Sequence, residues 1–89
     1  MKAIEVFISG IVQGVGFRYF TLKVARELGI KGYVKNLPDG RVYIYAVGDE
    51  KSLEKLLEKV KIGPPLAVVR DVVVREAEPK EFEKFEVRR

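Results

Sequence analysis

The amino-acid sequence predicts an α+β fold, in which a sheet of short strands carries two helices on one of its faces. Apolar residues alternate with polar ones over several short stretches, which is typical of half-buried strands. Over two longer stretches they recur every three to four positions, which is typical of amphipathic helices. Turn residues separate these stretches, and no linker or repeat divides the 89 residues. A single domain over residues 1–89 is therefore expected.

The first strand and the first helix are predicted from a change of period. Apolar side chains alternate with more polar ones from Ile4 to Ile8, so we expect a strand over residues 3–9. Helical spacing of apolar residues then predicts a helix over residues 18–28. Gly29 follows as a suitable end for that helix.

A hairpin is predicted next. Residues 30–35 and 41–47 alternate as strands do. The Leu-Pro-Asp-Gly sequence between them, residues 37–40, is a strong turn. In the second of these strands Tyr43 and Tyr45 lie on the face opposite its apolar side chains.

The second half of the chain predicts one more helix and one more long strand. Asp49 is the expected N-cap of the helix, and a Gly-Pro-Pro sequence beginning at Gly63 ends it. A valine-rich strand is expected over residues 66–74, followed by a charged connection over residues 76–83. Residues 85–87 predict a short closing strand or an extended tail.

The order β-α-β-β-α-β, with a short extra C-terminal strand, predicts a ferredoxin-like α/β sandwich with an antiparallel sheet. In that fold the first two strands run parallel and the third lies between them. The C-terminal ends of the first and second strands therefore lie at the same edge of the sheet, about 10 Å apart. We expect the loop after the first strand and Asn36, which follows the second, to share one small ligand.

Missing residue types narrow the possible chemistry. The chain contains no His and no Cys, which excludes a histidine base, a cysteine nucleophile and a zinc site of the ordinary type. We expect no metal and no cofactor. The net charge of +4 favours anionic ligands. Without an apolar run of roughly 18 residues or a signal-peptide pattern, a cytoplasmic protein that does not bind membranes is expected.

Amide side chains are nearly absent. The chain has one Asn, Asn36, and one Gln, Gln13, against ten Glu and ten Lys. Such a composition is typical of hyperthermophilic proteins and predicts a thermostable one. If amides are avoided elsewhere, the two that remain are candidates for function. The alternative for Asn36 is a plain turn residue before Pro-Asp-Gly.

Residues 10–18 read Gly-Ile-Val-Gln-Gly-Val-Gly-Phe-Arg, between the first strand and the first helix. The glycines allow a sharp turn that exposes backbone N–H groups, and the helix start adds further donors. Arg18 adds a guanidinium fork that suits a phosphate. The stretch lacks the Gly-Lys-Ser/Thr sequence that ends a Walker A motif. It also lacks the full dinucleotide-binding fingerprint, because Tyr19 stands where that pattern has its third glycine. It predicts a cradle for one phosphoryl-sized group; a structural turn with a surface arginine is the alternative.

Residues 10–18 resemble the first signature of the acylphosphatase family, G-x-V-Q-G-V-x-F-R. Residues 32–36, followed by Gly40, Val42 and Gly48, resemble the second signature of that family. The length and the element order also agree, so the resemblance spans the whole chain.

The resemblance implies hydrolysis of the carboxyl-phosphate bond in small acyl phosphates, with inorganic phosphate as product and competitor. It implies that Arg18 and the loop N–H groups hold the phosphate and that Asn36 places the attacking water. The implied phosphate-binding loop comprises Gln13, Gly14, Val15, Gly16, Phe17 and Arg18. Many family members carry His where this chain has Phe20, and a hydroxyl residue where it has Leu37. These differences bear on the rate of hydrolysis and on substrate preference, but neither of them replaces Arg18 or Asn36.

Water is the expected nucleophile, because no side-chain nucleophile is present. The leaving carboxylate has a conjugate acid with a pKa of about 4, so it departs without a general acid. A metal-independent, monomeric hydrolase is therefore expected.

The element order and the anion cradle are also compatible with two other functions. The RNA-recognition motif has the same element order, and the open face of the sheet could carry aromatic residues for base stacking, namely Phe7, Tyr33, Tyr43 and Tyr45. The third strand lacks that family's glycine-aromatic pattern, so nucleic acid is not the expected partner. An anion-sensing module, related to an acylphosphatase-like domain of a larger carbamoyl-transfer protein, would keep the cradle and lack turnover.

Overall fold

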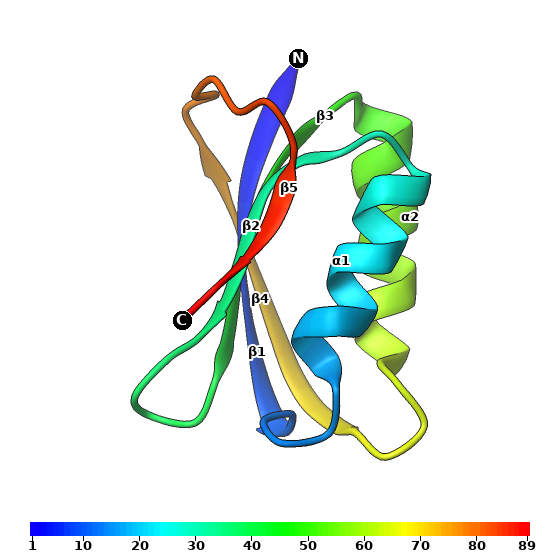
Figure 1. Cartoon of the computed structure of the whole chain (residues 1–89), viewed down its shortest axis with the longest axis vertical. Helices are drawn as coiled ribbons and strands as arrows, with labels where there is room; N and C mark the ends of the chain where they lie inside the picture. The colour runs from blue at the N-terminus through cyan, green and yellow to red at the C-terminus, as the bar shows by residue number, and fades with distance from the viewer.

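The computed structural model describes residues 1–89 and confirms the predicted element order (Figure 1). The elements are β1 (Lys2–Ile11), α1 (Phe17–Glu27), β2 (Lys31–Asn36), β3 (Val42–Gly48), α2 (Glu50–Ile62), β4 (Val68–Ala77) and β5 (Phe85–Arg88). The five strands form one sheet in the order β4-β1-β3-β2-β5. Both helices cover the same face of that sheet (Figure 1). No helix is long and apolar enough to cross a membrane.

The strand order places the two predicted halves of the site at one end of the sheet. β3 lies between β1 and β2 and is antiparallel to both, so β1 and β2 run in the same direction. The loop after β1 and the turn after β2 consequently lie at the same end of the sheet (Figure 1). One pairing departs from the expected antiparallel sheet, because β5 pairs with β2 in parallel.

β1 extends further than predicted. It continues through Gly10 and Ile11, which pair with Val69 and Val68 of β4 after a shift of register beyond Ser9. Gly10 has a φ of 131°, and a Cβ atom there would lie 2.1 Å from the carbonyl oxygen of Val68. The glycine at position 10 thus allows two strands to approach each other closely. The loop between β1 and α1 is shorter than residues 10–18, since α1 already begins at Phe17.

β4 begins and ends later than the predicted 66–74. The N–H of Ala67 donates to the carbonyl of Pro64 at 3.0 Å, so the preceding residues form a turn and Leu66 is exposed. At its other end β4 pairs with β1 as far as Ala77, inside the stretch predicted to be a charged connection. The closing strand is confirmed as β5.

The main core lies between the sheet and the two helices. Its largest fully buried side chains include Phe17, Phe85, Ile8, Ile44 and Leu56. Phe17 is the first residue of α1, so burial of its ring fixes where the helix begins relative to the sheet. The predicted N-cap of α2 is confirmed, because Asp49 accepts a hydrogen bond from the N–H of Ser52 at 2.9 Å.

A second, smaller cluster lies on the other face of the sheet. Tyr43 and Tyr45 are nearly buried there. The segment after β4 covers part of this face, because the Tyr45 hydroxyl donates to the carbonyl of Glu78 and accepts from the N–H of Lys80. The ring of Phe82 lies 5.5 Å from that of Tyr45, centre to centre. The face opposite the helices is therefore only partly open.

Candidate active site

The loop between β1 and α1 exposes a row of backbone donors. Gly14 and Gly16 have φ angles of 77° and 81°, in the left-handed region where glycine is free of strain. Gly16 is the N-cap of α1, and no side chain caps the helix there. None of the N–H groups of residues 13–18 donates to a backbone carbonyl of the chain. Free donors at a helix start, together with its positive dipole end, make a site for an anion.

Arg18 lies in the first turn of α1, next to these donors. Its Nη1 donates to the carbonyl oxygen of Arg88 in β5 at 3.3 Å. This contact leaves the rest of the guanidinium free for a ligand. β5 thus supports the arginine that the sequence marked as the phosphate-binding residue.

Asn36 is the last residue of β2, where it pairs with Val42 of β3. Its amide oxygen Oδ1 is shielded from solvent and has no hydrogen-bond partner. A buried polar atom without a partner is rare and costs about 1–3 kcal/mol. A half turn of the amide exchanges its oxygen and nitrogen with little change of shape, so either end can face a ligand.

One cavity of about 460 Å³ brings Arg18 and Asn36 together. Gly14, Gly16 and Phe17 of the loop also line it. No Asp or Glu is among its lining residues, whereas two arginines are. The cavity therefore favours an anion with more than one negative charge.

Four residues that were not predicted to belong to the site also line this cavity. They are Tyr19 and Leu22 of α1 and Val87 and Arg89 at the end of the chain. Tyr19 is 72% exposed. The position of Tyr19 beside Arg18 was the only feature of the sequence that could have pointed to these residues. The chain end could not be placed from the sequence, because its contribution depends on the pairing of β5 with β2.

Two of the predicted loop residues do not line the cavity, namely Gln13 and Val15. The side chain of Gln13 instead donates to the carbonyls of Leu37 and Arg41, in the turn between β2 and β3. These two residues can contribute to phosphate binding only through their backbone N–H groups. The chain also has no group of three or more Asp or Glu residues that could hold a metal ion.

Known proteins are similar to this chain over nearly its whole length. The acylphosphatase family model matches residues 4–87. An acylphosphatase of Archaeoglobus fulgidus is 70% identical over 87 residues, which cover 98% of each chain. The crystal structure of acylphosphatase from Bacillus subtilis has a TM-score of 0.96 at 40% identity and covers 100% of both chains.

A larger protein contains a similar unit. The crystal structure of full-length HypF in its phosphate- and nucleotide-bound form matches with a TM-score of 0.88 at 37% identity. That match covers 97% of this chain and 11% of HypF. Since the family model and the two full-length relatives cover nearly all of the sequence and the fold, this chain belongs to the acylphosphatase family, which hydrolyses acyl phosphates.

Proposed function

We propose that this chain cleaves the carboxyl-phosphate bond of small acyl phosphates by in-line attack of water on phosphorus. Arg18 and the N–H groups of residues 13–18 hold the phosphoryl group, and Asn36 holds the water. One observation carries the proposal. A single cavity is lined by loop residues with free backbone donors, by Arg18, whose guanidinium makes one internal hydrogen bond, and by Asn36, whose amide oxygen makes none.

Substrate binding is electrostatic in this proposal. The phosphoryl group of an acyl phosphate brings about two negative charges, and preorganised N–H donors with Arg18 offset them without having to move. The donors also stabilise the charge that spreads over the phosphoryl oxygens in the transition state. The loop therefore lowers the barrier as well as binding the ground state.

The nucleophile is a water molecule that donates a hydrogen bond to the amide oxygen of Asn36, once a half turn of the amide brings that oxygen to face the ligand. Holding that water in line with the scissile bond removes much of the entropic cost of bringing the two reactants together. The water oxygen bonds to phosphorus, the bond from phosphorus to the acyl oxygen breaks, and its electron pair leaves on the carboxylate. A phosphoryl oxygen takes the proton of the water, so the products are a carboxylate and dihydrogen phosphate.

Neither a general acid nor a metal is required by this scheme. The carboxylate leaving group is stable unprotonated, because its conjugate acid has a pKa of about 4. Both halves of the site come from one chain, so a monomer suffices. We also propose the cytoplasm as its compartment, which fractionation of the native cells would check.

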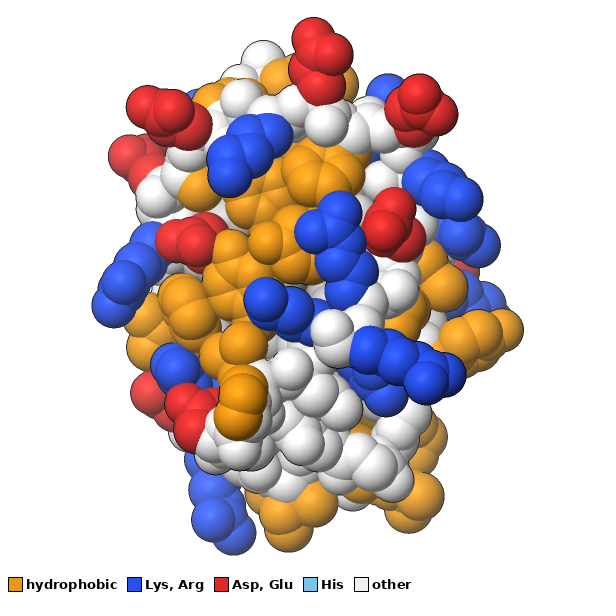
Figure 2. All heavy atoms as spheres, turned by 60° about the vertical axis from the view of Figure 1, so that its left-hand side comes forward, with side chains coloured by type: hydrophobic (Ala, Val, Ile, Leu, Met, Phe, Trp, Pro, Cys, Tyr) orange, Lys and Arg blue, Asp and Glu red, His pale blue; other side chains and the backbone are white.

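RNA binding on the sheet is not favoured. Basic side chains lie across the apolar patch on the face away from the helices (Figure 2). The guanidinium carbon of Arg88 lies 4.0 Å from the centre of the Tyr33 ring, and that of Arg41 lies 5.0 Å from the centre of Phe7. Rings that are already covered by cations of the chain are poorly available for base stacking.

Hydrolysis of benzoyl phosphate, with and without EDTA, tests the proposal. We expect turnover that is insensitive to EDTA and competitively inhibited by inorganic phosphate. Phosphate binding without turnover would instead indicate an anion-sensing module. Activity that disappears with EDTA would contradict the metal-independent scheme.

A further inference from the structure

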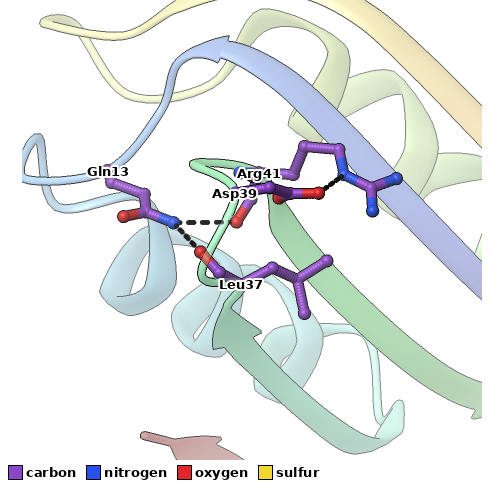
Figure 3. A network of polar contacts seen from close by, with 4 residues as sticks. All are labelled: Gln13, Leu37, Asp39 and Arg41. Atoms are coloured by element: carbon purple, nitrogen blue, oxygen red, sulfur yellow. Dashed lines mark hydrogen bonds and ion pairs between the residues drawn. The ribbon is translucent and has the colours of Figure 1, made fainter.

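Gln13 lies inside the loop between β1 and α1 but does not line the cavity. Its side chain points toward the turn between β2 and β3 (Figure 3). Its Nε2 donates to the carbonyl oxygen of Leu37 at 2.8 Å and to that of Arg41 at 2.9 Å. A side-chain amide has two N–H donors, so both are used in these contacts.

The two carbonyls that Gln13 contacts stand at the base of the turn that follows Asn36. Across this base the N–H of Leu37 also donates to the carbonyl of Arg41, at 2.8 Å. Gln13 therefore contacts both sides of the turn immediately after the last residue of β2. Because Leu37 directly follows Asn36, a displacement of Leu37 also displaces Asn36.

We propose that Gln13 is a positioning residue: it ties the loop that holds the phosphoryl group to the turn that follows the water-holding Asn36. The inference rests on the proposed function. The two hydrogen bonds set the spacing between phosphorus and the water, which in-line attack requires to be correct. A misplacement of about 1 Å in such a geometry can lower the rate by about 100-fold.

The neutral amide of Gln13 donates to both carbonyls. A carboxylate at position 13 would repel them, because it accepts hydrogen bonds and cannot donate. The turn has a second tie, in which Asp39 Oδ2 accepts from Arg41 Nε at 2.8 Å and Asp39 Oδ1 accepts from the Arg41 N–H at 3.1 Å. That tie is exposed and lies wholly within the turn, so it does not reach the phosphate loop.

The test uses two variants that keep the approximate length of the side chain and remove its donors, Gln13→Met and Gln13→Glu. We expect kcat on benzoyl phosphate to fall by about 10- to 100-fold in both. The dissociation constant of inorganic phosphate, measured by calorimetry, should change less than about threefold, because Arg18 and the backbone donors are untouched. Asp39→Asn is the matched control, since its Oδ1 still accepts from the Arg41 N–H and kcat should stay within about twofold.

A double-mutant cycle with Asn36→Ala separates positioning from loss of structure. If Gln13 acts through Asn36, adding Gln13→Met to Asn36→Ala should lower kcat by less than about threefold further. A full additional loss of kcat, a parallel loss of phosphate affinity, or a Gln13→Met variant with unchanged kcat would each overturn the inference. Failure of the proposed function is distinguishable, because it would appear as wild-type chain without turnover or as Asn36→Ala with undiminished kcat.

Discussion

Replacing Asn36 with alanine should slightly raise the stability of the fold and strongly lower kcat. The shielded Oδ1 atom of Asn36 makes no hydrogen bond in the folded chain, so its removal breaks no internal interaction. A buried polar atom without a partner costs about 1–3 kcal/mol. The side chain lines a cavity and is not packed in the core. We therefore expect the alanine variant to recover only part of this free-energy cost.

The expected gain in stability is about 0–1 kcal/mol once the lost contacts of the side chain are subtracted. For a domain of this size that corresponds to a rise in Tm of at most about 4–8 °C. The expected loss in kcat is about 100- to 1,000-fold, by analogy with the removal of one preorganised transition-state contact. This corresponds to about 3–4 kcal/mol of transition-state stabilisation.

Two measurements on the same Asn36→Ala preparation check this prediction. Guanidinium chloride unfolding gives the change in stability even if Tm is too high to reach, and steady-state hydrolysis of benzoyl phosphate gives kcat. Phosphate should still bind, because its donors are intact. A variant that loses more than about 1 kcal/mol of stability and keeps its kcat would refute the reasoning and make Asn36 a plain turn residue.

The remaining predictions concern the phosphate site, the backbone and pH. Arg18→Ala should weaken phosphate binding by about 100-fold or more in calorimetry, since two charge-assisted hydrogen bonds are lost at about 1.5–3 kcal/mol each; binding at wild-type affinity would disprove the assignment. Gly10→Ala should destabilise the fold by more than about 1 kcal/mol, because its Cβ would meet the carbonyl of Val68 at 2.1 Å. Gly40→Ala, where a Cβ meets nothing within 4 Å, should cost less, and equal losses would contradict this account. Hydrogen bonds from the first turn of α2 lower the pKa of Asp49 in the folded state. The stabilisation from this carboxylate is therefore present above its unfolded pKa of about 4 and lost as the pH falls below it. Unfolding of Asp49→Asn should accordingly depend less on pH in that range than unfolding of the wild type.

The meeting of Arg18 and Asn36 in one cavity could be predicted from the sequence. Periodicity gave the order of strands and helices, and the parallel direction of β1 and β2 follows from that order and the crossover helix. Glycine-rich turns and a lone asparagine then marked the two strand ends. No contact between distant side chains had to be known.

Other parts of the site depend on contacts that periodicity does not encode. Gln13 was predicted to belong to the phosphate loop, but its side-chain contacts to the Leu37 and Arg41 carbonyls depend on how the loop and the turn meet in space. The support of Arg18 by the Arg88 carbonyl depends on the parallel pairing of β5 with β2. Gly10 was assigned to the loop because glycine marks both turns and close strand approaches, and the pairing with β4 decides between them.

Hydrolysis in water enriched in oxygen-18 tests the central claim most directly. If water held by Asn36 attacks phosphorus, the heavy oxygen should appear in inorganic phosphate and the released carboxylate should remain unlabelled. Heavy oxygen in the carboxylate would mean attack on the carbonyl carbon. That result would contradict the assignment of the cavity to a phosphoryl group with water in line.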